Sequence, residues 1–190
     1  MKLNRTTWLS LLLAIIFSGG VYGYELVRSK QGVSQANTTS SQQLFQLQEA
    51  DIQQVVIEKP ELTLELVKTG DRSSPWQLKS PQDVPANMGT VAFLLDLLAS
   101  GKPQRTFIVS ADKRSQYGLD NPIATVTFKS DNKSQQIILG RSGLNEDTIY
   151  AQIVSPSTGA TATEVSLVSK NWQYAVERDL EAWKQSTVIK

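Results

Sequence analysis

Hydrophobic and polar residues alternate in several short runs after Leu44, and this alternation predicts β-strands. In the run 62–67, Leu62, Leu64 and Leu66 are expected on a buried face, while the residues between them face water. Comparable runs bounded by Pro, Gly, Asp or Asn predict further strands at residues 52–57, 76–78, 105–109, 123–129, 135–139, 148–154 and 164–168. Together these strands predict an antiparallel sheet that opens as a meander.

Two segments instead repeat their hydrophobic residues at helical spacing. The helix predicted at residues 87–100 has a broad apolar stripe, with Asn87 as its N-cap and Gly101 as a left-handed stop. A second amphipathic helix is predicted at residues 170–184, with Ser169 as its N-cap and a stripe formed by Trp172, Val176, Leu180 and Trp183. A mainly antiparallel sheet packed with two helices is an α+β domain.

The chain begins with a different pattern, an apolar segment without any charge from Trp8 to Tyr24. Its 17 residues reach the lower limit for a membrane-spanning helix, and aromatic residues stand at both of its ends. A basic start, an apolar core at residues 9–17 and small residues near Gly23 also fit a cleaved secretory signal. The length of the segment and its weak cleavage site favour a permanent anchor.

This segment divides the chain into three parts. Residues 1–28 are predicted to be an N-terminal transmembrane anchor or signal, and residues 29–43, rich in Ser, Thr and Gln, a flexible linker. Residues 44–190 are then one α+β domain, which is expected outside the cytoplasm because the short tail before Trp8 is easily retained inside. The chain has the sequence of a single-pass membrane protein.

Composition narrows the functions that this domain can have. The charges balance, with 19 Lys and Arg against 18 Asp and Glu, and they are interleaved, so no nucleic-acid binding is expected. The chain has no histidine and no cysteine, which excludes Ser-His-Asp and Cys-His nucleophilic sites and zinc sites of ordinary composition. No cofactor or metal is predicted, and binding becomes a better expectation than catalysis.

Two local patterns are candidates for a functional role. The run Tyr117-Gly-Leu-Asp-Asn-Pro122 predicts a chain reversal in which Gly118 adopts positive φ, Leu119 enters the core and Pro122 prevents a helix. Leu180 and Trp183 allow two interpretations. They either pack the last helix onto the sheet or extend beyond the domain and contact a partner, because aromatic residues are enriched in interface cores.

The order of these motifs resembles the family catalogued as domain of unknown function 4340. The resemblance covers about residues 44–169 and rests on Trp76, Pro81 with the Leu-rich helix, the run from Tyr117 to Pro122, the run Ile137-Ile-Leu-Gly140 and Tyr150. It implies one N-terminal membrane anchor, a periplasmic or thylakoid-lumenal domain, and photosynthetic or transport complexes as candidate clients. The family assigns no catalytic residues, and many of its members contain more than one copy of the unit.

The sequence therefore predicts a membrane-anchored accessory, assembly or scaffold protein that binds a membrane protein complex without catalysis. Two alternatives stay open. One is a module that binds a lipid, peptide or glycan in an apolar pocket between helix 87–100 and the sheet. The other is a carboxylate-dependent hydrolase, which needs two acids about 5–10 Å apart in a cleft.

Overall fold

A computed structural model describes residues 42–131, 133–154 and 162–186 of the chain. The predicted anchor, Trp8 to Tyr24, and most of the predicted linker lie outside these residues. Among the residues that are described, no helix is both long enough and apolar enough to span a membrane.

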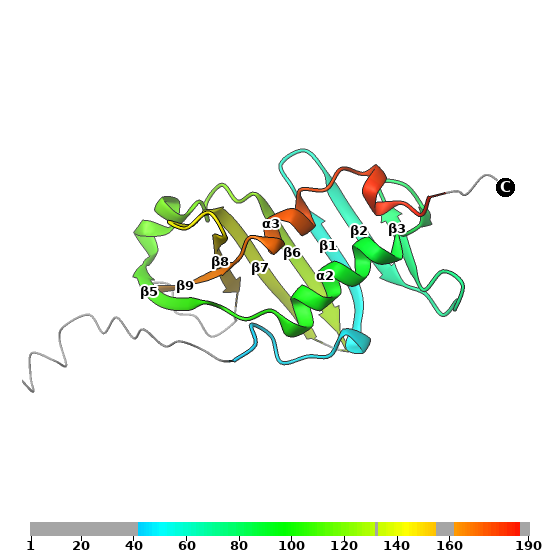
Figure 1. Cartoon of the computed structure of the whole chain (residues 1–190), viewed down its shortest axis with the longest axis horizontal. Helices are drawn as coiled ribbons and strands as arrows, with labels where there is room; N and C mark the ends of the chain where they lie inside the picture. Colours follow the sequence, from blue (N-terminus) through cyan, green and yellow to red (C-terminus); the bar gives the residue numbers. More distant parts are fainter. Residues whose placement is uncertain (1–41, 132, 155–161, 187–190) are drawn as a thin grey trace, which may run out of the picture. The chain divides into compact units, whose positions relative to one another are not determined.

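The described residues form one antiparallel sheet of nine strands in the order β4-β3-β2-β1-β6-β7-β8-β9-β5 (Figure 1). The strands are β1 (Ile52–Glu58), β2 (Thr63–Lys68), β3 (Trp76–Ser80), β4 (Val84–Pro85), β5 (Arg105–Ser110), β6 (Ala124–Ser130), β7 (Lys133–Ser142), β8 (Thr148–Val154) and β9 (Ala162–Ser169). Helices lie across one side of this sheet. The mainly antiparallel α+β class predicted from the sequence is confirmed.

The sheet is built from two meanders that grow in opposite directions from its centre. Strands β1 to β4 run outward to one edge, and β6 to β9 run outward toward the other, with β1 and β6 paired in the middle. Between the two meanders, the chain leaves β4 at one edge, crosses the sheet and adds β5 beside β9 at the opposite edge. The crossing places β5 far from the strands that precede it in sequence.

The crossing is made by helix α2 (Met88–Ser100), and most of its sequence signals are confirmed. The Asn87 side chain accepts hydrogen bonds from the backbone N–H groups of Gly89 and Thr90, as an N-cap does. The predicted left-handed stop at Gly101 is wrong, because this residue is extended with φ −58° and ψ 136°. Glycine is required there for a different reason. A Cβ atom at Gly101 would collide with the carbonyl oxygen of Leu97.

The predicted helix at residues 170–184 is broken into two pieces. Helix α3 (Asn171–Val176) ends after six residues, and a short 3-10 helix, η3 (Glu181–Trp183), follows after a bend. Ser169 still contributes at the start, because its hydroxyl accepts a hydrogen bond from the N–H of Asn171. The bend brings Trp183 and Gln185 back to β4 and to the start of α2, where the backbone N–H of Gln185 donates to the Pro85 carbonyl. A straight helix could not make these long-range hydrogen bonds.

Gly140 was expected to end a strand, but β7 continues through it to Ser142. The pairing of β7 with β8 shifts between Leu139 and Ser142, so Gly140 lies at an irregularity of the ladder. The carbonyl oxygen of Tyr117 occupies the place where a side chain at Gly140 would begin. The glycine therefore marks a close approach between two backbone segments rather than a strand end.

The main core lies between the helices and one face of the sheet. It contains the buried side of α2, the buried strand residues of β1, β2, β6 and β7, and the indole rings of Trp172 and Trp183. A smaller cluster lies at the β5 end and includes Leu119, Tyr150 and Val165. Because Tyr150 alternates with Ile149 and Ala151 of the main core, this second cluster is on the opposite face of the sheet.

Candidate functional site

The run from Tyr117 to Pro122 forms the structural turn predicted from its sequence. Gly118 has φ +71°, and a side chain there would meet the backbone nitrogen of Arg141 at 2.6 Å. Leu119 is only 2% exposed and belongs to the smaller core cluster. The Tyr117 ring packs edge-on against Tyr150, with their centroids 4.9 Å apart. These contacts use the distinctive residues of the run for packing.

Arg114 holds this turn against the sheet and was not identified from the sequence. Its guanidinium donates to the Gln152 side-chain oxygen at 2.7 Å and to the Leu119 carbonyl at 3.2 Å. It also forms an ion pair with Asp120 at 3.1 Å. Arg114, in the 3-10 helix η2 (Ala111–Tyr117), therefore joins the turn at Leu119 and Asp120 to Gln152 on β8. The sequence alone does not predict this role, because it depends on β8 bringing Gln152 beside Arg114 from 38 positions away.

The structure packs both Leu180 and Trp183 against the sheet and the helices, as the first of the two interpretations predicts. Trp183 is fully buried in the main core, and Leu180 is half-buried against the same core. Full burial leaves none of the Trp183 ring exposed for direct contact with a partner, and a partner contact of Leu180 stays a prediction. The stripe that these residues share with Trp172 and Val176 does pack onto the sheet and α2, although through two short helices instead of one long helix.

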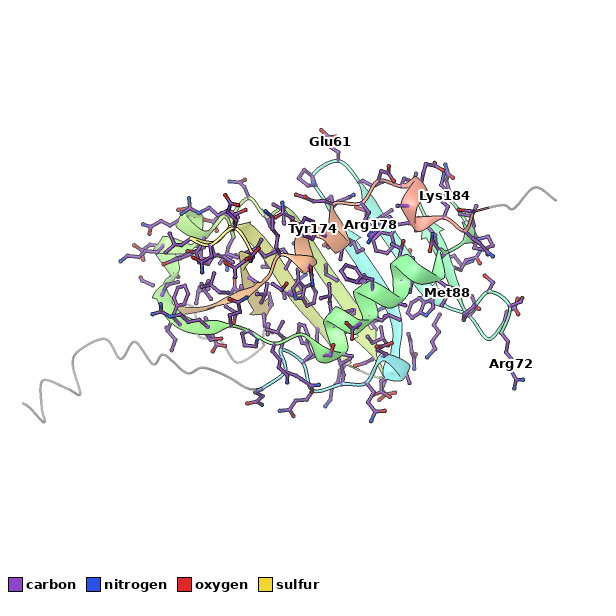
Figure 2. The ribbon with its side chains drawn as sticks, in the orientation of Figure 1. Glu61, Arg72, Met88, Tyr174, Arg178 and Lys184 are labelled. Atoms are coloured by element: carbon purple, nitrogen blue, oxygen red, sulfur yellow. The ribbon has the colours of Figure 1, made fainter. Side chains whose placement is uncertain are left out.

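The outward side of the two helical segments carries a different set of exposed and half-buried residues. Met88, Ala92 and Phe93 come from α2, Tyr174 comes from α3, and Arg178 follows α3 by two residues. Met88 is 41% exposed and Tyr174 is 55% exposed. Figure 2 labels Met88, Tyr174 and Arg178 on the helix-covered side of the sheet. We call these five residues the α2–α3 surface.

Helix α2 contributes few charges to the α2–α3 surface, whereas on the α3 side the Lys170 ammonium lies 5.9 Å from the centroid of the Tyr174 ring. The only ionisable residue of α2 is Asp96, and the other exposed positions of the helix are Met, Gly, Ala and Ser. Amphipathic helices on a protein surface usually have charged residues on their outer side. The small apolar outer side of α2 is therefore unusual for a helix that only covers a sheet.

The contacts of Arg178 connect the two helical segments of this surface. Its guanidinium carbon lies 5.6 Å from the centroid of the Phe93 ring, a cation–π distance. Its carbonyl oxygen accepts a hydrogen bond of 2.8 Å from the Lys59 ammonium, which comes from the turn between β1 and β2. Partial burial lowers the pKa of Lys59, and the nearby carboxylates of Asp179 and Glu177 oppose this effect. The sequence showed none of these contacts because they join segments more than eighty residues apart.

Two buried polar atoms beside this arrangement have no hydrogen-bond partner among the described residues. They are the Nε atom of Arg178 and the Oε1 atom of Gln173. Gln173 uses its amide nitrogen to donate to Glu177 at 2.9 Å, which leaves its oxygen free. A buried polar atom without a protein partner is costly unless water or another group satisfies it.

The predicted apolar pocket between α2 and the sheet is filled by side chains of α2, including the buried Leu94 and Leu98. A groove of about 690 Å³ lies elsewhere, between residues 42–51 and the β6–β7 turn, and most of its lining is polar: Gln42, Gln43, Gln46, Asp51, Ser130, Asp131, Lys133 and Gln135, with Leu44, Phe45 and Leu47. Within the described residues, no cluster of three or more acidic side chains could hold a metal ion.

The fold defines a class: an α+β domain with one large antiparallel sheet and helices across one of its faces. The sequence model of the family "domain of unknown function (DUF4340)" matches residues 76–190, so the chain belongs to this family. The match begins at Trp76 and continues to the C-terminus, whereas the motif order suggested residues 44–169. No match is found among curated proteins or among solved structures.

Proposed function

We propose that this protein is a membrane-anchored accessory, assembly or scaffold protein that binds a membrane protein complex without catalysis. The observation that supports the proposal is the α2–α3 surface, where exposed Met88 and Tyr174 lie on helices that carry few charges. The proposed arrangement is a single-pass anchor at residues 8–24, a linker, and an extracytoplasmic domain that presents this surface to its neighbour.

The chemistry of the α2–α3 surface favours a protein partner. Interface cores are enriched in Tyr, Phe, Met and Arg and depleted of Lys, Glu and Asp, because the former bury large areas at a small desolvation cost. Met88 can adapt its unbranched side chain to an irregular partner. The Arg178 guanidinium is already stacked on Phe93, so less of its side-chain entropy remains to be lost on binding.

The proposed anchor explains how the few residues of the α2–α3 surface would be sufficient to bind a partner in the membrane. A domain held near the membrane by a linker of about fifteen residues has a typical reach of about 20 Å. Its effective concentration toward a membrane-embedded neighbour is then in the millimolar range for a short flexible linker. Photosynthetic and transport complexes are the proposed clients because the family resemblance suggests them.

Co-purification with a matched pair of variants tests this proposal. The full chain is expressed in its native membrane, solubilised gently and captured, and the co-purified proteins are identified by mass spectrometry. Tyr174→Glu should remove the client complex, because it replaces an exposed aromatic ring of the α2–α3 surface with a carboxylate. Leu144→Glu, at a loop position that is 94% exposed, should retain it. The proposal is wrong if Tyr174→Glu remains folded and retains the same complex.

The groove of about 690 Å³ supports a second candidate, the extracytoplasmic module for a small lipid, peptide or glycan. Its glutamine side chains offer both donors and acceptors, which suits neutral polar ligands such as glycans. Gln135→Ala should then weaken the binding of a soluble oligosaccharide panel, whereas Tyr174→Glu should not. Equal oligosaccharide binding by Gln135→Ala and the natural chain would remove this candidate.

A further inference from the structure

The two edges of the nine-stranded sheet are protected to very different degrees. At one edge, β4 has only two residues, and one of them is Pro85. Short strands and proline are the usual means by which proteins prevent another strand from pairing with an edge. At the other edge, β5 has six residues, Arg105-Thr-Phe-Ile-Val-Ser110, and contains no proline. In Figure 1, β5 lies at the left end of the sheet.

The sequence of β5 makes this edge suitable for pairing. Residues 106–110 carry no charge, and a lysine or glutamate on the edge is the other common protection. Ile108 is 63% exposed, which is unusual for an isoleucine in the middle of a strand. Among the residues that the structure describes, β9 is the only strand that pairs with β5, so its outer N–H and C=O groups have no strand partner there.

The side of the sheet on which Ile108 lies follows from the register. Ile108 pairs with Glu164, and Thr106 pairs with Ser166. Ser166 in turn is opposite Ala151, which belongs to the main core beneath the helices. Since residues directly opposite one another point to the same face, Ile108 lies on the helix-covered face, and Phe107 and Val109 lie on the other face with the smaller cluster.

We propose that β5 pairs antiparallel with β5 of a second copy of this chain, about a two-fold axis that passes between the two Ile108 residues. In this register Ile108 is directly opposite Ile108 of the second copy, so each covers the other. Phe107 is opposite Val109 of the second copy, which joins the two smaller clusters into one. The partner that this edge fits is thus a second copy, and the product is a continuous sheet with no exposed β5 edge.

Charge favours a second copy as the occupant of the edge. Arg105 is the only charged residue of β5, and the two-fold register brings it opposite the uncharged Ala111 of the second copy. The two Arg105 side chains are at opposite ends of the paired strands. Strand β5 therefore meets its own copy with no like charges directly opposite one another, which avoids the repulsion that destabilises paired strands.

This interface is separate from the α2–α3 surface and would leave it free. A two-fold axis perpendicular to the sheet keeps the helix-covered faces of both copies on the same side. The dimer would therefore present two α2–α3 surfaces toward the same side, and a symmetric client could bind both. Dimerisation itself does not depend on the proposed client binding.

Cross-linking through a single cysteine tests the register directly, because the natural chain has no cysteine. Ile108→Cys places one thiol from each copy on either side of the two-fold axis. Opposite Cβ atoms in an antiparallel pair are about 4.5–5.5 Å apart, which is close enough for a disulfide. Mild oxidation of the full chain in detergent should convert most of Ile108→Cys to a disulfide-linked dimer. Leu144→Cys, on a highly exposed loop, should stay monomeric on a denaturing gel.

A charge on the edge tests the dimer without a cross-link. Ile108→Lys should halve the mass measured by light scattering of the detergent-solubilised full chain, while its melting temperature and circular dichroism show that the domain is folded. Leu144→Lys should leave the mass unchanged. A natural chain of monomeric mass, equal cross-linking by Ile108→Cys and Leu144→Cys, or a dimer that persists in folded Ile108→Lys would each overturn the proposal.

Discussion

The backbone N–H of Asn87 donates a 2.8 Å hydrogen bond to the carbonyl oxygen of Trp183, so the start of α2 and the final described turn of the chain are directly joined. The hydroxyl of Thr90 strengthens this junction by donating to the Ala182 carbonyl at 2.8 Å. Residues nearly one hundred positions apart in sequence thereby position each other. The same junction buries the indole of Trp183 and shapes the region in which the α2–α3 surface lies.

Trp183→Ala should reduce the free energy of unfolding by about 3–5 kcal/mol, the usual range for a buried tryptophan that is replaced by alanine. The indole is fully buried, although its Nε1–H has no hydrogen-bond partner among the described residues. Trp183→Phe should therefore cost less than Trp183→Ala. Urea denaturation measures both, with Leu144→Ala as a surface control expected within about 0.5 kcal/mol of the natural chain. A near-neutral Trp183→Ala would contradict the observed packing.

Asn87→Ala should reduce stability by about 1 kcal/mol, because the side chain accepts two backbone N–H groups at the start of α2. Asn87→Asp keeps an acceptor at this position and should retain most of the stability. The hydrogen bond from the Asn87 backbone to Trp183 is unaffected by either change. Thermal unfolding followed by circular dichroism compares the two variants, and equal melting temperatures for both would exclude a capping role.

Gly140→Ala should destabilise the domain by about 1–3 kcal/mol, the cost of forcing extra atoms into a packed site. A Cβ atom there would meet the Tyr117 backbone, which cannot move without disturbing the turn at Gly118. Gly70→Ala is the matched control, because no atom lies within 4 Å of the added Cβ. Chemical denaturation of the two variants under one condition should show a large loss for the first and almost none for the second.

Arg114 and Gln152 should be energetically coupled, because the guanidinium donates to the Gln152 side-chain oxygen at 2.7 Å. Arg114→Ala and Gln152→Ala each break this hydrogen bond, so the double variant should lose less stability than the sum of the two single variants. A coupling of about 0.5–3 kcal/mol is expected for residues in direct contact. Strict additivity in the double-mutant cycle would show that the contact contributes nothing in solution.

The stability of the domain should depend on pH through Lys59, in the alkaline range below its ordinary pKa of 10.5. Burial lowers the pKa of Lys59 in the folded chain, so the unfolded chain binds more protons between the two pKa values. Unfolding therefore becomes less favourable as pH rises through this window, and the Lys59 contribution to stability increases. Denaturation of the natural chain and Lys59→Gln at several alkaline pH values tests this, and a difference between them that stays constant would refute it.

Local patterns predicted individual elements well because their information lies within a few residues. The alternation of Leu62, Leu64 and Leu66, the apolar stripe of α2 and the cap at Asn87 each depend on neighbours in sequence. The turn from Tyr117 to Pro122 was predicted for the same reason, since Gly118 and Pro122 have intrinsic backbone preferences. These elements agree with the structure almost to their ends.

Two of the mistaken predictions share one physical cause, which is a contact with a distant segment. Helical periodicity at residues 170–184 was outweighed by hydrogen bonds from Gln185 to Pro85 and from Asn87 to Trp183. Gly140 was expected to be a strand end because the residues next to it in sequence do not indicate that the Tyr117 backbone packs against it. The α2–α3 surface was missed because α2 was judged only by the face it buries.

Amino-acid pattern alone was sufficient to establish an α+β domain, most of its strand and helix positions, and the absence of His and Cys chemistry. These follow from short-range backbone preferences and from composition. The tertiary structure alone established the strand order, the position of β5 at one edge of the sheet, the burial of Trp183 and the exposure of Met88 and Tyr174. They depend on which segments pack together, and that is settled by long-range hydrogen bonds and burial rather than by any local pattern.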